Sequence, residues 1–178
     1  MIDTTPRWQE ISRTTVFEKY GRGIEKVVFQ LPDGRIEDFF IKAESSAAAV
    51  LALTEDLKVV VAKQFRPGPM DFLYELPGGF ISPGEEALVA MERELLEETG
   101  YRGQLEHVTT CYDDAYSTVV RHCFVATNCV KIAEPCTEDN EFIEVTLLDQ
   151  PSFRNILRKG RMSDVEVAYL GLDHLNLL

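Results

Sequence analysis

The stretch RELLEETGY gathers three glutamates, Glu94, Glu97 and Glu98, just before Gly100. As the last turns of a helix, it places their carboxylates at the negative end of the helix dipole, which disfavours them. Glu94 and Glu98 also form a like-charge i,i+4 pair. A hard divalent cation would offset these costs, since Mg²⁺ typically binds one or two carboxylates together with substrate phosphates. The spacing favours metal-assisted phosphate chemistry, and a solvated acidic helix face is the simpler alternative.

The helix that positions these carboxylates has start and stop signals. Ser82 is a capping residue type, Pro83 suits the first helical position, and Glu85 completes a capping box with Ser82. Gly100 fits the left-handed position that ends a helix. The sequence therefore predicts a helix from Pro83 to Thr99.

One face of this helix is expected in the core. At about 100° per residue, three apolar side chains fall on one arc and predict a buried stripe: Leu88, Met91 and Leu95. Glu94 and Glu98 lie only about 40° apart beside that stripe, whereas Glu97 lies further toward solvent. The first two carboxylates therefore project from the border between core and water, which is the geometry of a site wall.

The rest of the chain is predicted to be mostly β. Residues 24–42 read as a hairpin with a turn at Pro32-Asp33-Gly34, and residues 47–65 as a second hairpin turning near Glu55-Asp56. Residues 66–79 read as a loop with glycine and proline punctuation. Further β segments are expected at 101–112, 119–130 and 141–148, and closing helices at 151–160 and 163–178, the last opened by a capping box of Ser163 and Glu166. Together these elements predict a mixed α/β or α+β domain with an N-terminal β extension.

Composition narrows the function classes. A chain of 178 residues with 45% hydrophobic content can form one well-packed domain. Its net charge of −12, from 30 acidic and 18 basic residues, argues against a long nucleic-acid partner. A small anionic substrate remains compatible, because a divalent cation can invert the charge of a local site.

The expected compartment is the cytoplasm. Nothing approaches the run of about 18 apolar residues that a membrane span needs, and MIDTTPRWQE has no features of a secretory signal. No CxxC or zinc-ligand spacing occurs among the four cysteines, which are Cys111, Cys123, Cys129 and Cys136. Reduced thiols are therefore expected, with a disulfide as the alternative.

The window GFISPGEEALVAMERELLEETGY, residues 79–101, resembles the Nudix box at each specified position. The shared pattern is Gly, five residues, Glu, seven residues, Arg-Glu-Leu, one residue, Glu-Glu, one residue and Gly-Tyr. A pattern of this length is far more specific than a short glycine motif. The segments LPDG, QFRPG, ELPGG and EFIEV match, in order, the ADP-ribose pyrophosphatase-like branch of the Nudix hydrolases, and the resemblance covers most of the chain from about Trp8 onward.

The resemblance implies a Nudix fold, in which a mixed β-sheet is sandwiched between helices. It implies a β-rich extension over residues 1–44 that supports a homodimer, and a hydrolase domain over residues 45–178. It also implies hydrolysis of the pyrophosphate bond of ADP-ribose or a related nucleoside diphosphate sugar. The products would be a nucleoside monophosphate and a sugar phosphate, and the implied cofactor is Mg²⁺, with Mn²⁺ as an alternative.

Motif positions imply the metal ligands. Glu94 and Glu98 would be the principal ligands, with Glu97 close to the same cluster and the backbone carbonyl of Gly78 as a further ligand. In pyrophosphate hydrolysis, metal ions neutralise phosphate oxygens, lower the pKa of a bound water and hold both in line. Positioning and electrostatic stabilisation then carry most of the catalysis.

Other residues are implied in catalysis or substrate binding. Arg93 would orient nearby carboxylates and Glu85 would organise the loop and helix. Arg66, in QFRPG, would contact a substrate phosphate or terminal ribose, a task that suits a guanidinium fork; a surface salt bridge is its alternative role. Glu75, in YELPGG, would contact metal or ribose.

The general base is expected from the acidic loop TEDNEFIEV. It offers Glu138, Asp139 and Glu141, and Asp139 and Glu141 are the preferred candidates, with no choice between them. The alternative for each is a merely solvated acidic side chain.

The aromatic residues and one departure bear on substrate. Phe65, Trp8 and Tyr116 are candidates for stacking on a base, although core packing is the more common role of an aromatic residue. The segment DDAYST stands where ADP-ribose hydrolases usually carry a proline-containing loop, which puts ADP-ribose itself in question. The alternatives are a hydrolase of another nucleotide, such as a dinucleoside polyphosphate, and a catalytically silent sensor, which the intact box disfavours.

Overall fold

The structure, a computed structural model, describes residues 5–137 and 142–178. The chain divides into two compact units. The smaller unit comprises Met1–Ser45 and Tyr112–Val120, and the larger unit comprises Ser46–Cys111 and Arg121–Leu178.

The smaller unit contains a three-stranded antiparallel sheet in the order β1-β2-β3. Its strands are β1 Gln9–Lys19, β2 Arg22–Gln30 and β3 Ile36–Lys42. A two-residue turn joins β1 to β2, and its residues Tyr20 and Gly21 have φ of 52° and 72°, the backbone geometry that suits strand twist in a hairpin. Gly34, with φ of 86°, lies in the turn before β3. The predicted hairpin of residues 24–42 is confirmed, whereas β1 was not predicted as a separate strand.

A segment distant in sequence completes the smaller unit. The backbone N–H of Lys42 donates to the carbonyl of Tyr116 at 2.8 Å, and the N–H of Thr118 donates to the carbonyl of Lys42 at 2.9 Å. Lys42 Nζ also lies 2.8 Å from a carboxylate oxygen of Asp113. The ring of Tyr116 stacks on Phe39 with centroids 6.1 Å apart. Residues 112–120 therefore belong physically with the N-terminal strands.

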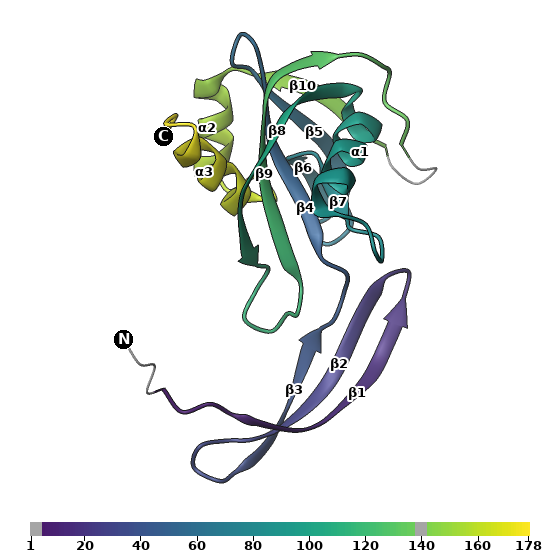
Figure 1. Cartoon of the computed structure of the whole chain (residues 1–178), viewed down its shortest axis with the longest axis vertical. Coiled ribbons are helices and arrows are strands. Elements are labelled where there is room, and N and C mark those ends of the chain that lie inside the picture. The colour runs from purple at the N-terminus through teal and green to yellow at the C-terminus, as the bar shows by residue number, and fades with distance from the viewer. Residues whose placement is uncertain (1–4, 138–141) are drawn as a thin grey trace. The chain divides into compact units, whose positions relative to one another are not determined.

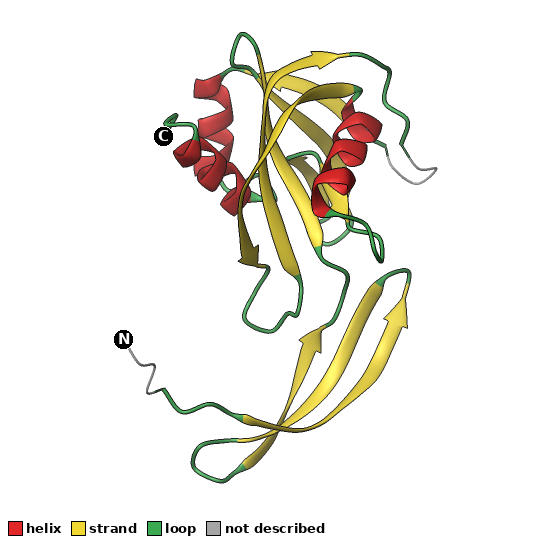
Figure 2. Ribbon diagram, in the orientation of Figure 1, coloured by secondary structure: helices red, strands yellow, loops and turns green. Residues whose placement is uncertain are grey.

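The larger unit is a mixed sheet with helices on both faces (Figures 1 and 2). The strand order is β10-β5-β4-β9-β8, with β6 beside β5 and β7 beside β4. Its strands are β4 Ala47–Thr54, β5 Val59–Arg66, β6 Asp71–Glu75, β7 Gly78–Phe80, β8 Tyr101–Tyr112, β9 Val120–Lys131 and β10 Glu144–Leu148. Its helices are α1 Ala87–Thr99, α2 Gln150–Arg158 and α3 Val165–His174. Helix α1 covers one face, and α2 and α3 cover the other (Figure 1).

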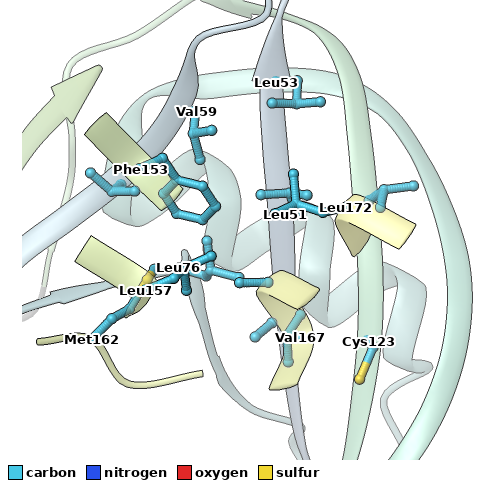
Figure 3. Close-up of a cluster of buried hydrophobic side chains, with 14 residues drawn as sticks. Leu51, Leu53, Val59, Leu76, Cys123, Phe153, Leu157, Met162, Val167 and Leu172 are labelled. Carbon is cyan, nitrogen blue, oxygen red and sulfur yellow. The ribbon is translucent and has the colours of Figure 1, made fainter. Parts of the chain in front are cut away.

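The central strand β4 explains the layers. Successive side chains of a strand point to opposite faces. Ala48, Val50 and Ala52 pack with Met91 and Leu95 of α1. Leu51 and Leu53 point the other way and pack with Phe153 and Leu172 of α2 and α3 (Figure 3). Because both faces are covered, β4 reads as a continuous apolar run, and the predicted sheet between helices is confirmed.

Helix α1 begins later than predicted. The predicted start at Pro83 is wrong, because residues 82–85 form a turn in which the N–H of Glu85 donates to the carbonyl of Ser82 at 2.9 Å. Gly84 adopts φ of 81° in that turn, which interrupts a helix. The Glu85 carboxylate does accept from the N–H of Ser82 at 3.0 Å, so half of the capping box exists outside the helix. The helix itself starts at Ala87.

Three smaller predictions are also wrong. Leu88 is 47% exposed, whereas Met91 and Leu95 are buried as predicted. The predicted loop of residues 66–79 contains the short strands β6 and β7. The predicted capping box of Ser163 and Glu166 is also wrong. Helix α3 has Asp164 at its N-cap, in a left-handed conformation and without a side-chain cap, and the Glu166 carboxylate lies 3.2 Å from Arg121 instead.

Two further observations concern the helices and the cysteines. Within residues 5–137 and 142–178, every helix is too short or too polar to cross a membrane. The four cysteines are present as free thiols.

Candidate active site

The end of α1 is fixed by Gly100. This residue has φ of 76°, and its N–H donates to the carbonyl of Leu96 at 2.8 Å. A Cβ at this position would lie under 3.0 Å from the carbonyl oxygen of Ala133. The carbonyl of Gly100 in turn accepts from the N–H of Ile132 at 2.8 Å. Both conformation and space therefore require glycine, which holds the acidic helix end in one place and confirms the predicted helix stop.

Glu98 is a buried carboxylate beside β7. The residue is only 6% exposed, and the N–H of Gly78 donates to its Oε2 at 2.9 Å. A Cβ on Gly78 would collide with the backbone of Ala48 and Ala49 in β4. Glycine at position 78 thus lets β7 pair closely with β4 and present its backbone to Glu98.

Glu94 occupies the space above the next glycine. A Cβ added to Gly79 would meet the carboxylate carbon and both oxygens of Glu94 at under 3.0 Å. Gly79 pairs with Ala48 in the sheet, so its backbone is fixed. The carboxylates of Glu94 and Glu98 therefore lie side by side against the backbone of a glycine pair.

Arg93 connects the carboxylates to the preceding turn. Its Nε and Nη2 donate to the two oxygens of Glu85 at 3.1 and 3.2 Å, a bidentate pair. Its Nη1 donates to Glu94 at 2.9 Å and to Glu97 at 3.1 Å. These bonds raise the pKa of the Arg93 guanidinium, with Glu85 as the main cause. The same bond to Arg93 lowers the pKa of Glu85, helped by the Ser82 N–H.

The donor set suits a hard cation. Glu97 is the most solvent-exposed of the three box glutamates, with 46% of its side chain exposed, as the helical angles predicted. No group of three or more His, Cys, Asp or Glu side chains converges on one point within the described ranges. Glu94 and Glu98 nevertheless offer carboxylate oxygens next to the Gly78 backbone, and oxygen ligands are those that Mg²⁺ prefers.

A second polar cluster joins β5 to β6. Glu75 is buried, and its Oε2 accepts from Gln64 Nε2 at 2.9 Å. Arg66 Nε donates to Glu75 Oε1 at 2.8 Å, and Arg66 Nη2 binds the other oxygen. The pKa of Arg66 is raised mainly by these bonds, and the charge of Glu98 adds to the effect. The structure thus brings Arg66 and Glu75 together and relates them electrostatically to the acidic helix end.

The remaining predicted residues lie elsewhere. Glu138, Asp139 and Glu141 fall outside the described residues. Trp8 and Tyr116 belong to the smaller unit, where Trp8 contacts Phe29 and Phe39 at centroid distances of 5.8 and 5.1 Å. Phe65 forms an edge contact with Phe72 at 5.7 Å in the larger unit.

Gln64 is a contributor that the sequence pattern alone did not indicate. It is buried at 6% exposure and donates to Glu75. The period of two along β5 places Gln64 on the same side as Arg66, together with the buried apolar residues Val60 and Ala62. A polar side chain following apolar residues on one face was therefore the available signal. Its amide satisfies part of the buried carboxylate, which would otherwise be costly.

The chain is an α/β protein whose sheet is sandwiched between helices. It carries a carboxylate site, in which glutamates at a helix end lie over a glycine pair. Its residues 43–164 match the NUDIX domain. Since that match covers more than half of the chain, the chain belongs to the Nudix family, and the predicted Nudix pyrophosphohydrolase is confirmed at that level.

Relatives of known function share most of the chain. The ADP-ribose pyrophosphatase of Bacillus subtilis (strain 168) is 30% identical over 143 residues, covering 79% of this chain and 77% of that protein. The ADP-sugar pyrophosphatase of Mus musculus is 31% identical over 151 residues, covering 80% and 67%. A crystal structure of an ADP compounds hydrolase superimposes with a TM-score of 0.76 over 97% of this chain and 98% of that one, at 15% identity. This last likeness confirms the fold.

Proposed function

We propose that this protein is a divalent-metal-dependent hydrolase that cleaves the pyrophosphate bond of ADP-ribose or a related nucleoside diphosphate sugar. The products are a nucleoside monophosphate and a sugar phosphate. The observation that carries the proposal is the pair of carboxylates, Glu94 and Glu98, held against the Gly78–Gly79 backbone at the end of α1. The relatives that act on ADP-ribose and ADP-sugars support the substrate class.

The metal ligands are proposed to be Glu94, Glu98 and the Gly78 carbonyl, with Glu97 adjoining them. Mg²⁺ is the proposed ion, and Mn²⁺ has the same preference for this donor set. When bound, such an ion neutralises phosphate oxygens and lowers the pKa of a water. The like-charge pair at the negative helix end is then stabilised by its ligand.

Arg93 is proposed to position the carboxylates. Its Nη1 reaches both Glu94 and Glu97, while Glu85 holds the other side of the guanidinium in a bidentate pair. Because a guanidinium is planar, two bonds on one edge fix the direction of the remaining nitrogen. Arg93 thus transmits the position of the 82–85 turn to the glutamates.

Arg66 is proposed to bind an anionic or ribose oxygen of the substrate. Its Nε and Nη2 bind Glu75, so the plane of the guanidinium is fixed and Nη1 lies at the far edge. The side chain is 44% exposed, which leaves it accessible. Glu75 and Gln64 therefore orient Arg66, and Glu75 is the second proposed substrate-site residue.

The general base is proposed to be Asp139 or Glu141. Attack on a pyrophosphate requires a carboxylate or imidazole to take a proton from the water. Separate Asp139→Asn and Glu141→Gln variants would assign the role, because only the loss of the base removes the acidic limb of the pH–rate profile.

The cytoplasm is the proposed compartment, where free thiols persist.

A homodimer formed through residues 1–44 is also proposed. β1 is the edge strand of the smaller sheet and is exposed along its length. Ile11, Val16 and Phe17 are each about half exposed, and an uncovered apolar edge strand favours pairing with another chain. Sedimentation of wild type and Phe17→Lys tests this: wild type should sediment as a dimer and the variant should shift toward monomer. Leu57→Lys, an exposed apolar position in the larger unit, is the control, and a wild-type monomer would refute the dimer.

The decisive experiment combines substrate panel and variants. ADP-ribose, other nucleoside diphosphate sugars and dinucleoside polyphosphates are assayed with Mg²⁺ by phosphatase-coupled phosphate release. Glu98→Gln and Glu94→Gln should each lower turnover by at least about a hundredfold without loss of fold. Glu92→Gln, an exposed position on the same helix, should leave turnover unchanged. Retained turnover in both site variants would reject the ligand assignment, and binding without turnover of any compound would indicate a sensor.

A further inference from the structure

Two cysteines of the larger unit lie next to each other on neighbouring strands. Cys111 is on β8 and Cys123 is on β9, strands that are adjacent in the sheet. Their sulfur atoms are 3.6 Å apart. A disulfide needs a separation of about 2.05 Å, so the two sulfurs are in contact but not bonded, and they must move closer to form a bond. The two thiols therefore start in contact on adjacent strands, which is the arrangement from which a cross-strand bond would form.

The two thiols differ in access. Cys111 is partly exposed, whereas Cys123 is 1% exposed and lies in the core cluster shared with α3 (Figure 3). Burial raises the pKa of Cys123 to about 12, and the neighbouring Cys111 adds to the shift. A solution reagent can therefore reach Cys111 first, and Cys123 is the sulfur available to complete the reaction.

The remaining cysteines provide contrasts. Cys129 is buried at 2% exposure and Cys136 is exposed. Among the described residues, the contact of Cys111 with Cys123 is the one sulfur–sulfur approach within hydrogen-bonding range. The pairing is therefore specific to this position in the sheet.

The pair brackets the segment that leaves the larger unit. Residues 112–120 belong to the smaller unit, where they pair with Lys42, and the chain returns to the larger unit at Arg121. Cys111 precedes the point where the chain leaves the larger unit, and Cys123 follows the point where it returns. A bond between them would close residues 112–122 into a covalent loop.

We propose that Cys111 and Cys123 form a reversible intramolecular disulfide that locks the segment 112–122 when the protein meets a low-molecular-weight disulfide. The Cys111 thiolate attacks one sulfur of the reagent, and a thiolate leaves. Cys123 then attacks the Cys111 sulfur of this mixed disulfide, gives up its proton, and releases the second reagent thiol. One reagent disulfide is reduced to two thiols while two protein thiols are oxidised to one disulfide, so the electrons balance.

The experiment treats native protein with oxidised glutathione in a Cys136→Ser background, which removes the exposed competing thiol. We expect a mass decrease of about 2 Da and a peptide that links Cys111 to Cys123, both reversed by reductant. The Cys123→Ala variant should instead retain one glutathionyl group on Cys111. The Cys129→Ala variant should behave as the background protein does.

The lock has a physical consequence that is measured separately. Closing a loop restricts the unfolded chain, so oxidation should raise the Tm of the background protein. The Cys111→Ser variant, treated in the same way, should show no change in Tm. A linked peptide that forms only after the protein is unfolded, a stable glutathionyl adduct on Cys111 in the background protein, or an unchanged Tm after full oxidation would each overturn the proposal.

Discussion

The two sheets of this protein differ in how far their apolar side chains are buried. In the larger unit, helices cover both faces, and the strands β4 and β5 are buried almost throughout. In the smaller unit, β1 is exposed at each of its positions. Apolar side chains stand on both sheets, so the difference lies in cover and not in composition.

This contrast shows where precision is needed. Carboxylates that repel one another keep a fixed position only on a rigid support. The covered sheet provides that support, since β7 is paired with β4 beneath Glu94 and Glu98. The uncovered sheet carries no such cluster among its described residues and has surface available for a partner chain. Three pairs of matched substitutions, with one position in each unit, test this difference between the two sheets.

The largest difference is expected for phenylalanine truncations. Phe153 in α2 is 0% exposed, whereas Phe17 in β1 is 52% exposed. Phe153→Ala should cost about 3–5 kcal/mol of unfolding free energy because it leaves a cavity. Phe17→Ala should cost less than about 0.5 kcal/mol in protein diluted enough to be monomeric. Equilibrium urea unfolding measures both, and equal costs would mean that β1 is covered by its own chain.

An intermediate difference is expected for two left-handed glycines. Gly100 and Gly21 have φ of 76° and 72°, so alanine is strained at either site by about 1 kcal/mol. A Cβ at Gly100 also collides with the Ala133 carbonyl, whereas at Gly21 nothing lies within 4 Å. Gly100→Ala should therefore cost more than about 2 kcal/mol and lower the Tm by several degrees. Thermal unfolding of both variants is the measurement, and a tolerated Gly100→Ala would show that the helix end can shift.

The smallest difference is expected in the loss of thermal stability at acidic pH. Bonds to Arg93 lower the pKa of Glu85 below its usual 4.5, and a bond to Arg13 does the same for Glu10 in the smaller unit. A carboxylate with a lowered folded-state pKa contributes stability above its unfolded pKa and loses it as pH falls through the folded value. The Tm of Glu85→Gln should thus decline less steeply than that of wild type below about pH 4.5.

Glu10→Gln gives the matched control for acid. The Glu10 side chain is solvent-exposed and that of Glu85 is partly exposed, and ion pairs near the surface contribute little to stability, so each effect is expected to be small. Only Glu85→Gln should also lower turnover at neutral pH, because Arg93 loses the partner that orients it. Equal turnover in both variants would separate Glu85 from the site.

Much of the fold could be predicted because it depends on local signals. The turn at Pro32-Asp33-Gly34 has its own chemistry, and Gly100 ends its helix by conformation. The box spacing identified the glutamates, and helical angles ordered their exposure correctly, from Glu98 at 6% to Glu97 with 46% of its side chain exposed.

The predictions failed where the position of a side chain depends on a residue that is distant in the sequence. Glu85 belongs to a turn because Arg93, eight positions later, holds its carboxylate. Glu166, in the first turn of α3, does not form the predicted capping box because Arg121 on β9 pairs with its carboxylate. Gln64 acquired its role only when β6 brought Glu75 beside it. In each case a tertiary hydrogen bond or ion pair, which the local sequence pattern does not indicate, decides where the side chain lies.

The dependence of residues 112–120 on Lys42 limits how this protein can be shortened. A fragment that begins at residue 45 would retain the matched NUDIX region almost whole, yet it would strip hydrogen-bond partners from Tyr116 and Thr118. The segment of residues 112–120 between β8 and β9 therefore depends on the N-terminal strands for these backbone hydrogen bonds. Minimal versions of this enzyme would need a redesigned β8–β9 connection before the first strands could be discarded.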